Sequence, residues 1–234
     1  MNQDEMMQRL QAAVKFHNQG DLEQAENIYL QVLAIDENNY FANNFYGCIQ
    51  REKKNFENGI TYLKRAIELQ ADNPDAHFNL GNLLKDAERW DEAISSYEMS
   101  LKLNPEAPMV LHNLGLCLEK REDFKPAVLA LRKSLDMRPH SVKVLVNLGN
   151  MLQKTGNVAE AISCYRKAVE IEPDSVAAYI GLTLTLKEDG QEFEAVALLK
   201  NAYKTENSLL QSLQLVASIY SMGEDFAASI FQSS

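Results

Sequence analysis

Apolar residues recur along this chain in a pattern that repeats every 34 positions. When repeats begin at residues 6, 40, 74, 108, 142, 176 and 210, the repeating pattern falls at positions 4, 7, 8 and 11 and again at 20, 24, 27 and 28, with large apolar residues mostly at 7, 11 and 24. This spacing places apolar side chains on one face of a helix. Each repeat is therefore predicted to contain two helices. The chain is predicted to consist of a leader at 1–5 and one domain at 6–234, with six full repeats and a seventh that is cut short.

Small residues occupy repeat positions 8 and 20 almost throughout, as at Gly81 and Ala93. A polar break separates the two apolar stripes, and prolines follow the second stripe at Pro105, Pro139 and Pro173. Small residues let two helices approach closely, and proline ends the second helix. One helix pair alone cannot bury both of its apolar faces. The predicted fold is therefore all-α, a solenoid of stacked antiparallel helix pairs.

The residues at these fixed positions resemble the signature of the tetratricopeptide repeat family. In the third repeat they are Leu80, Gly81, Trp90, Ala93, Tyr97 and Pro105. The resemblance covers the chain from about Met6 to Ser234 and implies a right-handed superhelix whose concave wall is made by the first helix of each repeat. Departures occur at Asn43 and Gln50, which stand at expected core positions, and at Glu192, which displaces the turn aromatic to Phe193.

A row of three asparagines marks the predicted concave wall. At about 100° per residue, repeat positions 2, 5, 6, 9, 12 and 13 lie opposite the apolar stripe of the first helix, and position 6 is Asn79, Asn113 and Asn147. A carboxamide offers both a donor and an acceptor, so such a row can hold the main chain of an extended peptide. The row is similar to the asparagine column of O-linked N-acetylglucosamine transferases, which implies peptide binding. The alternative is that these asparagines only solvate the groove.

Further candidate groove residues flank this row, namely Phe78, Asn82, Met109, His112, Lys143 and Asn150. Phe78 and Met109 are candidates for side-chain pockets. The spacing of Asn82, Asn113 and Lys143 also resembles the carboxylate clamp of cochaperone repeats. Phe78 and Asn147 stand where that clamp has cations, which leaves one cation for two carboxylates and disfavours a clamp.

The same face becomes apolar towards the N-terminus. The residues are Met7, Leu10, Val14, Phe41 and Phe45. Exposed apolar surface usually marks a partner site. The open alternative is that the curvature of the solenoid or the chain's own ends cover these residues.

Charge and motifs exclude several functional classes. The net charge is -10, with 23 basic and 33 acidic residues, so a nucleic-acid groove is not expected. The N-terminus lacks the features of a signal peptide and no apolar run approaches about 18 residues, which predicts a cytoplasmic chain without membrane insertion. Cys48, Cys117 and Cys164 are expected to be reduced structural thiols. Sequence motifs for catalysis, metal binding or cofactor binding are absent, so we expect neither enzyme activity nor a cofactor.

The sequence therefore predicts an interaction scaffold that binds a protein or peptide partner. Two alternatives stay open. The phrases Leu10-Gln11-Ala12-Ala13 and His77-Phe78-Asn79-Leu80-Gly81-Asn82 resemble repeats that precede bacterial glycosyl-, sulfo- or methyltransferase domains, which implies a recruiting region of a larger transferase. A self-assembling scaffold is the other. Because the seventh repeat breaks off, we also expect either further sequence after Ser234 or a homodimer formed through the C-terminal end.

Overall fold

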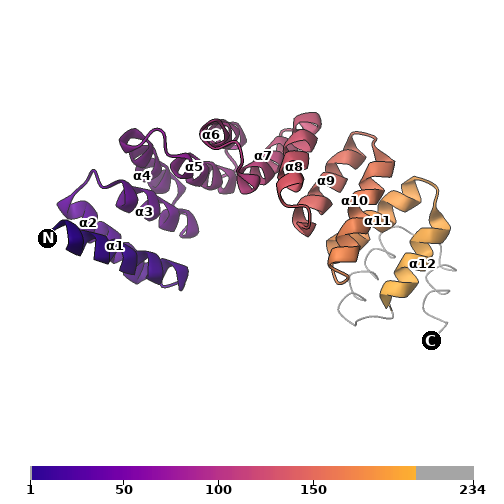
Figure 1. Cartoon of the computed structure of the whole chain (residues 1–234), viewed down its shortest axis with the longest axis horizontal. Helices are drawn as coiled ribbons and strands as arrows, with labels where there is room; N and C mark the ends of the chain where they lie inside the picture. The colour runs from indigo at the N-terminus through magenta and orange to yellow at the C-terminus, as the bar shows by residue number, and fades with distance from the viewer. Residues whose placement is uncertain (1, 204–234) are drawn as a thin grey trace. The chain divides into compact units, whose positions relative to one another are not determined.

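The computed structural model describes residues 2–203, and within that range the chain folds into twelve α-helices joined by short turns (Figure 1). The helices are α1 (Gln3–Asn18), α2 (Leu22–Ile35), α3 (Tyr40–Glu52), α4 (Phe56–Leu69), α5 (Pro74–Asp86), α6 (Trp90–Leu103), α7 (Pro108–Lys120), α8 (Phe124–Met137), α9 (Val142–Lys154), α10 (Val158–Ile171), α11 (Val176–Glu188) and α12 (Glu192–Tyr203). The chain divides after Asp123 into two compact units. The N-terminal unit contains α1 to α7, and the described part of the C-terminal unit contains α8 to α12.

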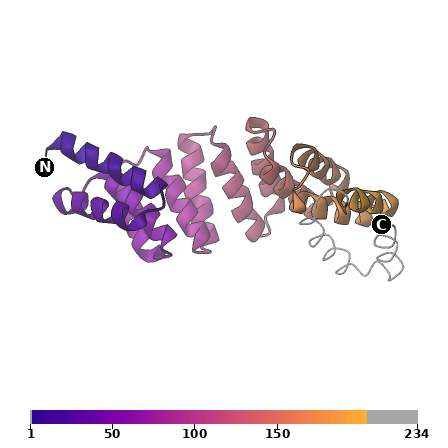
Figure 2. The same ribbon diagram turned by 90° about the horizontal axis from the view of Figure 1, so that it is seen from below.

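The helix boundaries follow a spacing of 34 residues. The helices α3, α5, α7, α9 and α11 begin at residues 40, 74, 108, 142 and 176, and every described second helix begins at repeat position 17. In three repeats the second helix ends two residues before the predicted proline. In the N-terminal unit, helices that follow one another in sequence lie side by side (Figures 1 and 2). The all-α class and the stacked helix pairs are thus confirmed, whereas the seventh repeat lies outside the described residues.

The first helix begins before the first repeat. We expected residues 1–5 to be a leader, but α1 begins at Gln3 because Asn2 caps it. The Asn2 side chain accepts a hydrogen bond from the Glu5 backbone N–H at 2.8 Å, and the Glu5 carboxylate accepts one from the Asn2 backbone N–H at 3.1 Å. This reciprocal capping box extends α1 by three residues before the predicted boundary at Met6.

Small residues allow an aromatic ring to lie against the neighbouring helix. A Cβ atom added at Gly81 would lie 2.6 Å from Cε1 of Tyr97, and one at Gly149 would lie 2.7 Å from Cε1 of Tyr165. Tyr97 and Tyr165 are fully buried. The small residue at repeat position 8 is therefore required by the large residue at position 24 of the same repeat.

The departures from the repeat pattern are accommodated in different ways. The side chain of Asn43 is buried and donates to the backbone carbonyls of Glu37 and Asn39, at 2.9 Å each. Buried Gln50 donates to the Glu26 carboxylate at 2.7 Å. Phe193 is 94% exposed, so it does not replace the turn aromatic that Glu192 displaces. Buried polar residues thus keep the fold by hydrogen bonding, whereas the displaced aromatic ring contributes little packing.

The turn inside each described repeat contains one residue with a left-handed backbone. This residue always occupies repeat position 15, and the six residues are Gly20, Lys54, Glu88, Glu122, Gly156 and Gly190, with φ between 58 and 81°. Glycine adopts this conformation readily, whereas residues with a Cβ atom adopt it at a cost. Three of the six turns therefore contain a strained residue.

Candidate functional site

Within each unit, the candidate site is the side of the first helices formed by repeat positions 2, 5, 6, 9, 12 and 13, which we term the first-helix face. In the N-terminal unit, two of the predicted asparagines make hydrogen bonds to the preceding repeat. Nδ2 of Asn79 donates to Oδ1 of Asn44 at 3.1 Å, and Nδ2 of Asn113 donates to Oδ1 of Asn82 at 2.7 Å. Asn79 and Asn113 are half-buried. These amides therefore link α5 to α3 and α7 to α5 while part of each side chain stays exposed.

Two further predicted groove residues accept hydrogen bonds from buried tyrosines. The Tyr97 hydroxyl donates to Oδ1 of Asn82 at 2.9 Å, and the Tyr165 hydroxyl donates to Oδ1 of Asn150 at 2.6 Å. Burial raises the pKa of both tyrosines well above the ordinary value, so both hydroxyls stay protonated and remain donors. Asn82 and Asn150 thus have a structural role as acceptors, which the sequence analysis missed.

The residue types at repeat positions 9 and 24 could have indicated this acceptor role from the sequence. In the third and fifth repeats, tyrosine at position 24 occurs together with asparagine at position 9. The fourth repeat has leucine at both positions. The third-repeat pair is Tyr97 with Asn82, and the fourth-repeat pair is Leu131 with Leu116. Reading the two positions together predicts the hydrogen bond, because a buried hydroxyl needs an acceptor.

Apolar side chains accompany the amides on the same face. The Phe78 ring is half-buried and lies 6.2 Å from the Tyr97 ring, measured between centroids. Met109 is 47% exposed, and His112 is half-buried. The face therefore offers apolar contact area next to its carboxamides.

At the N-terminal end of this face, one predicted exposed residue is buried. Leu10 is only 5% exposed because it packs in a core cluster with Ala13 and Tyr29, so our expectation that it lies open to a partner is wrong. Met7 and Phe41 are exposed as expected. Val14 and Phe45 are half-buried.

The remaining predicted residues belong to the C-terminal unit. Asn147 and Asn150 are half-buried on α9, and Lys143 is exposed near the start of the same helix. Asn82 and Asn113, the other two clamp candidates, are bonded to each other in the N-terminal unit. The three clamp candidates thus come from both units, and within the N-terminal unit the two asparagines use each other as partners.

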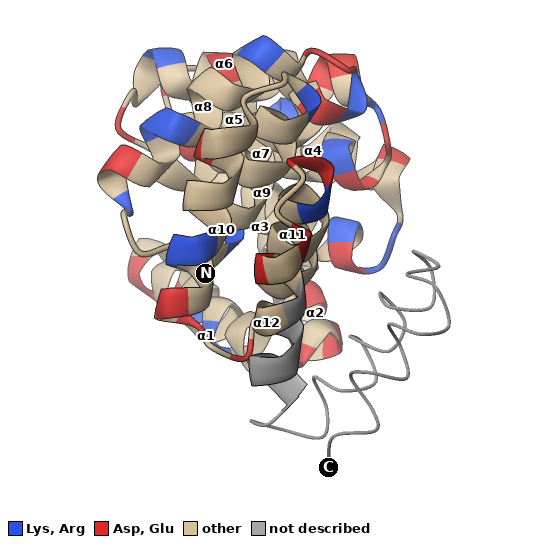
Figure 3. Cartoon of the chain, turned by 90° about the vertical axis from the view of Figure 1, so that its right-hand side faces the viewer, with Lys and Arg blue, Asp and Glu red and all other residues tan. Residues whose placement is uncertain are grey.

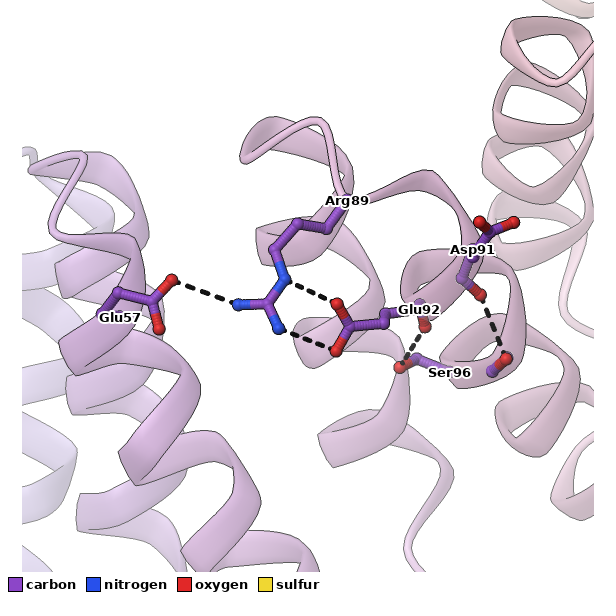
Figure 4. Close-up of polar contacts among 6 residues, drawn as sticks. Glu57, Arg89, Asp91, Glu92 and Ser96 are labelled. Atoms are coloured by element: carbon purple, nitrogen blue, oxygen red, sulfur yellow. Dashed lines mark hydrogen bonds and ion pairs between the residues drawn. The ribbon is translucent and has the colours of Figure 1, made fainter.

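Charged groups pair locally between neighbouring repeats. His17 contacts Glu52 at 2.8 Å, and Arg51 contacts Asp86 at 3.4 Å. Arg89, the residue before α6, lies between Glu57 on α4 and Glu92 on α6, at 3.1 and 2.6 Å (Figure 4). Basic and acidic residues are accordingly interspersed over the described helices (Figure 3). Such pairing reduces the charge that the face presents to a ligand.

Nucleophilic, metal-binding and membrane-spanning sites each require particular features of the described residues. Burial raises the pKa of the Cys117 and Cys164 thiols to about 11, so both are poor nucleophiles near neutral pH. Among the described residues, His, Cys, Asp and Glu do not gather in groups that could hold a metal ion. None of the described helices combines the length and the apolar character needed to cross a membrane.

Family models for repeat sequences match most of residues 10–175. A model described as "Tetratricopeptide repeat" matches residues 74–106 and 142–175, and another with the same description matches 10–39 and 110–141. A model described as "TPR repeat" matches residues 47–87.

Solved structures with low sequence identity are similar over most of the chain. A tetratricopeptide repeat protein from Parabacteroides merdae is 19% identical, with a TM-score of 0.71, over 97% of this chain and 91% of that chain. A structure described as a functional characterization of Pseudomonas aeruginosa pilF is 19% identical, with a TM-score of 0.73, over 90% of this chain and 96% of that chain. YrrB, described as "a TPR protein with an unusual peptide-binding site", is 19% identical, with a TM-score of 0.69, over 80% of this chain and 96% of that chain. At these identities the similarity shows the fold alone.

A human protein is similar over a short part of the chain. The protein O-mannosyl-transferase TMTC3 of Homo sapiens is 31% identical over 70 residues, which are 30% of this chain and 8% of that protein. The chain therefore matches less than a tenth of that relative's length.

Proposed function

Because the chain belongs to the tetratricopeptide repeat family, we propose that it is an interaction scaffold that binds an extended segment of a protein partner along its first-helix face. The observation that carries this proposal is the pair of half-buried amide contacts, Asn79 with Asn44 and Asn113 with Asn82. The proposed role is binding rather than catalysis.

The amides that link neighbouring repeats retain hydrogen-bonding capacity. Nδ2 of Asn79 and of Asn113 each uses one hydrogen in the inter-repeat bond, whereas a carboxamide has two such hydrogens and two lone pairs on its oxygen. The inter-repeat bond also fixes the side-chain rotamer, which lowers the entropy lost when a ligand binds. Two fixed amides in adjacent repeats can therefore hold successive main-chain groups of a ligand.

The spacing of the repeats fits an extended ligand. Packed helices lie about 8–10 Å apart, and an extended chain rises about 3.3 Å per residue. An extended ligand would then meet one groove asparagine at about every third residue. Phe78 and Met109 lie on the same face and would contact ligand side chains between the main-chain contacts.

Replacing the row of asparagines tests this proposal. The triple variant Asn79→Ala, Asn113→Ala and Asn147→Ala should weaken partner binding by about 1 kcal/mol for each direct hydrogen bond that is lost. Affinity is measured by calorimetry with a partner captured by affinity purification, and thermal unfolding of each variant separates binding from folding.

Two control variants sharpen this measurement. Asn27→Ala changes an exposed asparagine on α2, away from the first-helix face, and should leave affinity unchanged. Lys143→Ala should also have little effect if the main chain is recognised, and should weaken binding if a carboxylate is held. Unchanged affinity in the triple asparagine variant would contradict main-chain recognition.

A second candidate role is a substrate-recruiting region of a larger transferase. The observation that favours it is the short match to a human O-mannosyl-transferase, which accords with the resemblance of the opening repeats to those that precede bacterial transferase domains. In that role the first-helix face would bind the substrate protein of a separate catalytic domain. The intact mass of the natural protein tests this role, because a mass close to 26.4 kDa would contradict it.

A further inference from the structure

The third repeat shows how this fold satisfies a buried tyrosine at repeat position 24. The Tyr97 hydroxyl donates to Oδ1 of Asn82 at repeat position 9, and Asn113, at position 6 of the next repeat, donates to the same oxygen. The fifth repeat keeps the first of these bonds, from Tyr165 to Asn150. These repeats are an internal template for the surroundings of that hydroxyl.

The first repeat keeps the tyrosine but replaces both amides with hydrocarbon. Tyr29 is at position 24 and is fully buried, whereas position 9 is Val14 and position 6 of the next repeat is Phe45. The Tyr29 hydroxyl has no hydrogen-bond partner among the described residues. A buried hydroxyl without a partner destabilises the fold, and a phenylalanine would pack the same ring without that penalty.

We propose that the partner supplies the missing acceptor, so that the N-terminal end of the first-helix face is a subsite for an amide carbonyl carried by an apolar segment. This inference rests on the proposed function, because it places one more contact on the same extended ligand. Phe45 packs against Tyr29, and the half-buried Val14 and the exposed Met7 belong to the first-helix face of α1. These apolar side chains fit an apolar ligand residue on either side of the carbonyl.

The hydroxyl is suited to this role by its protonation and by its neighbours. Burial raises the pKa of Tyr29 well above its ordinary value, so the group stays a donor. The half-buried Phe45 ring stacks on Tyr29, with centroids 6.0 Å apart and an angle of 18° between the rings. Phe45 and Asn113 both occupy repeat position 6, in the second and fourth repeats. A displacement of the Phe45 ring would therefore open, beside Tyr29, the place that the Asn113 amide fills beside Tyr97.

Tyr29→Phe tests the subsite, with Tyr165→Phe as the matched control. The probe is a set of peptides selected from a random decapeptide display library on the 234-residue chain. We expect Tyr29→Phe to weaken the selected peptides about 3- to 10-fold and to leave the thermal stability of the free chain unchanged or higher. Tyr165→Phe should lower the thermal stability of the free chain, because it removes a hydrogen bond within the protein. It should leave the affinity for the selected peptides within about twofold.

A second variant supplies the acceptor from within the chain. Val14→Asn reproduces the template, so it should raise thermal stability and weaken the same peptides by a similar factor. Substituting Asn or Gln in a bound peptide distinguishes a side-chain amide from a main-chain carbonyl as the acceptor.

Two results would overturn the subsite. One is an affinity that Tyr29→Phe leaves unchanged for every selected peptide. The other is a loss of stability in Tyr29→Phe as large as in Tyr165→Phe, which would mean that water already satisfies the hydroxyl. Peptides that depend on Asn79 and Asn113 but not on Tyr29 would overturn the subsite alone. Peptides that depend on none of these residues, or a library without binders, would overturn the proposed function as well.

Discussion

The left-handed backbone at repeat position 15 shows most directly how single residues limit stability. Where this residue is Gly20, Gly156 or Gly190, an added Cβ would meet nothing within 4 Å, so packing does not decide which residue occupies the turn. The cost at Lys54, Glu88 and Glu122 is then a backbone cost alone. Position 15 can be changed without disturbing the core.

Glu88→Gly should stabilise the protein by about 1 kcal/mol, because glycine removes the strain of φ near 58°. Glu88→Ala is the matched control and should have little effect, since alanine keeps the strained Cβ. Gly156→Ala should destabilise by a similar amount. Thermal unfolding followed by circular dichroism measures all three variants, and equal effects of Gly and Ala at position 88 would show that the turn is not strained.

At the same scale, the sequence did not predict what the groove asparagines bond. A helical angle places Asn79 and Asn113 on one side of a single helix. Their bonds to Asn44 and Asn82 depend on the offset between successive helices, which one repeat does not encode. The paired pattern at positions 9 and 24 encodes part of this contact, because both residues belong to the same repeat.

At the scale of elements, the close approach of the two helices in a repeat depends on glycine facing tyrosine. The sequence predicted this approach correctly because both stripes are visible in the repeat pattern. The sequence pattern did not indicate the start of α1 at Gln3, because the cap formed by Asn2 and Glu5 lies before the first repeat. It also placed Leu10 on the exposed face, although this side chain packs into the core beside Tyr29.

Gly81→Ala should destabilise the protein by about 2 kcal/mol, since the new methyl group would lie 2.6 Å from a fully buried tyrosine ring. Ser95→Ala, on the exposed side of α6, is the control and should change stability by less than about 0.5 kcal/mol. Urea unfolding gives both values. If Gly81→Ala were as mild as the control, α5 and α6 would not be held at this distance by the ring.

At the scale of the whole molecule, repetition made the fold predictable and left the partner open. Each described repeat obeys the same register, so helix starts followed from counting. The single continuous domain predicted for residues 6–234 stays a prediction, because the chain is described as two compact units. On the first-helix face, basic side chains pair with acidic ones of the neighbouring repeat, so charge alone indicates no ligand class for this face.

The central claim is that carboxamides of the first helices hold the main chain of a partner. Its most direct test is the two-dimensional ¹H–¹⁵N spectrum of side-chain amides, recorded as a bound peptide is added. We predict that the signals of Asn79, Asn113 and Asn147 shift with the occupancy of the peptide, while those of Asn27 and Asn58 on the second helices stay in place. Signals of the three groove asparagines that remain unmoved at saturation would contradict the account.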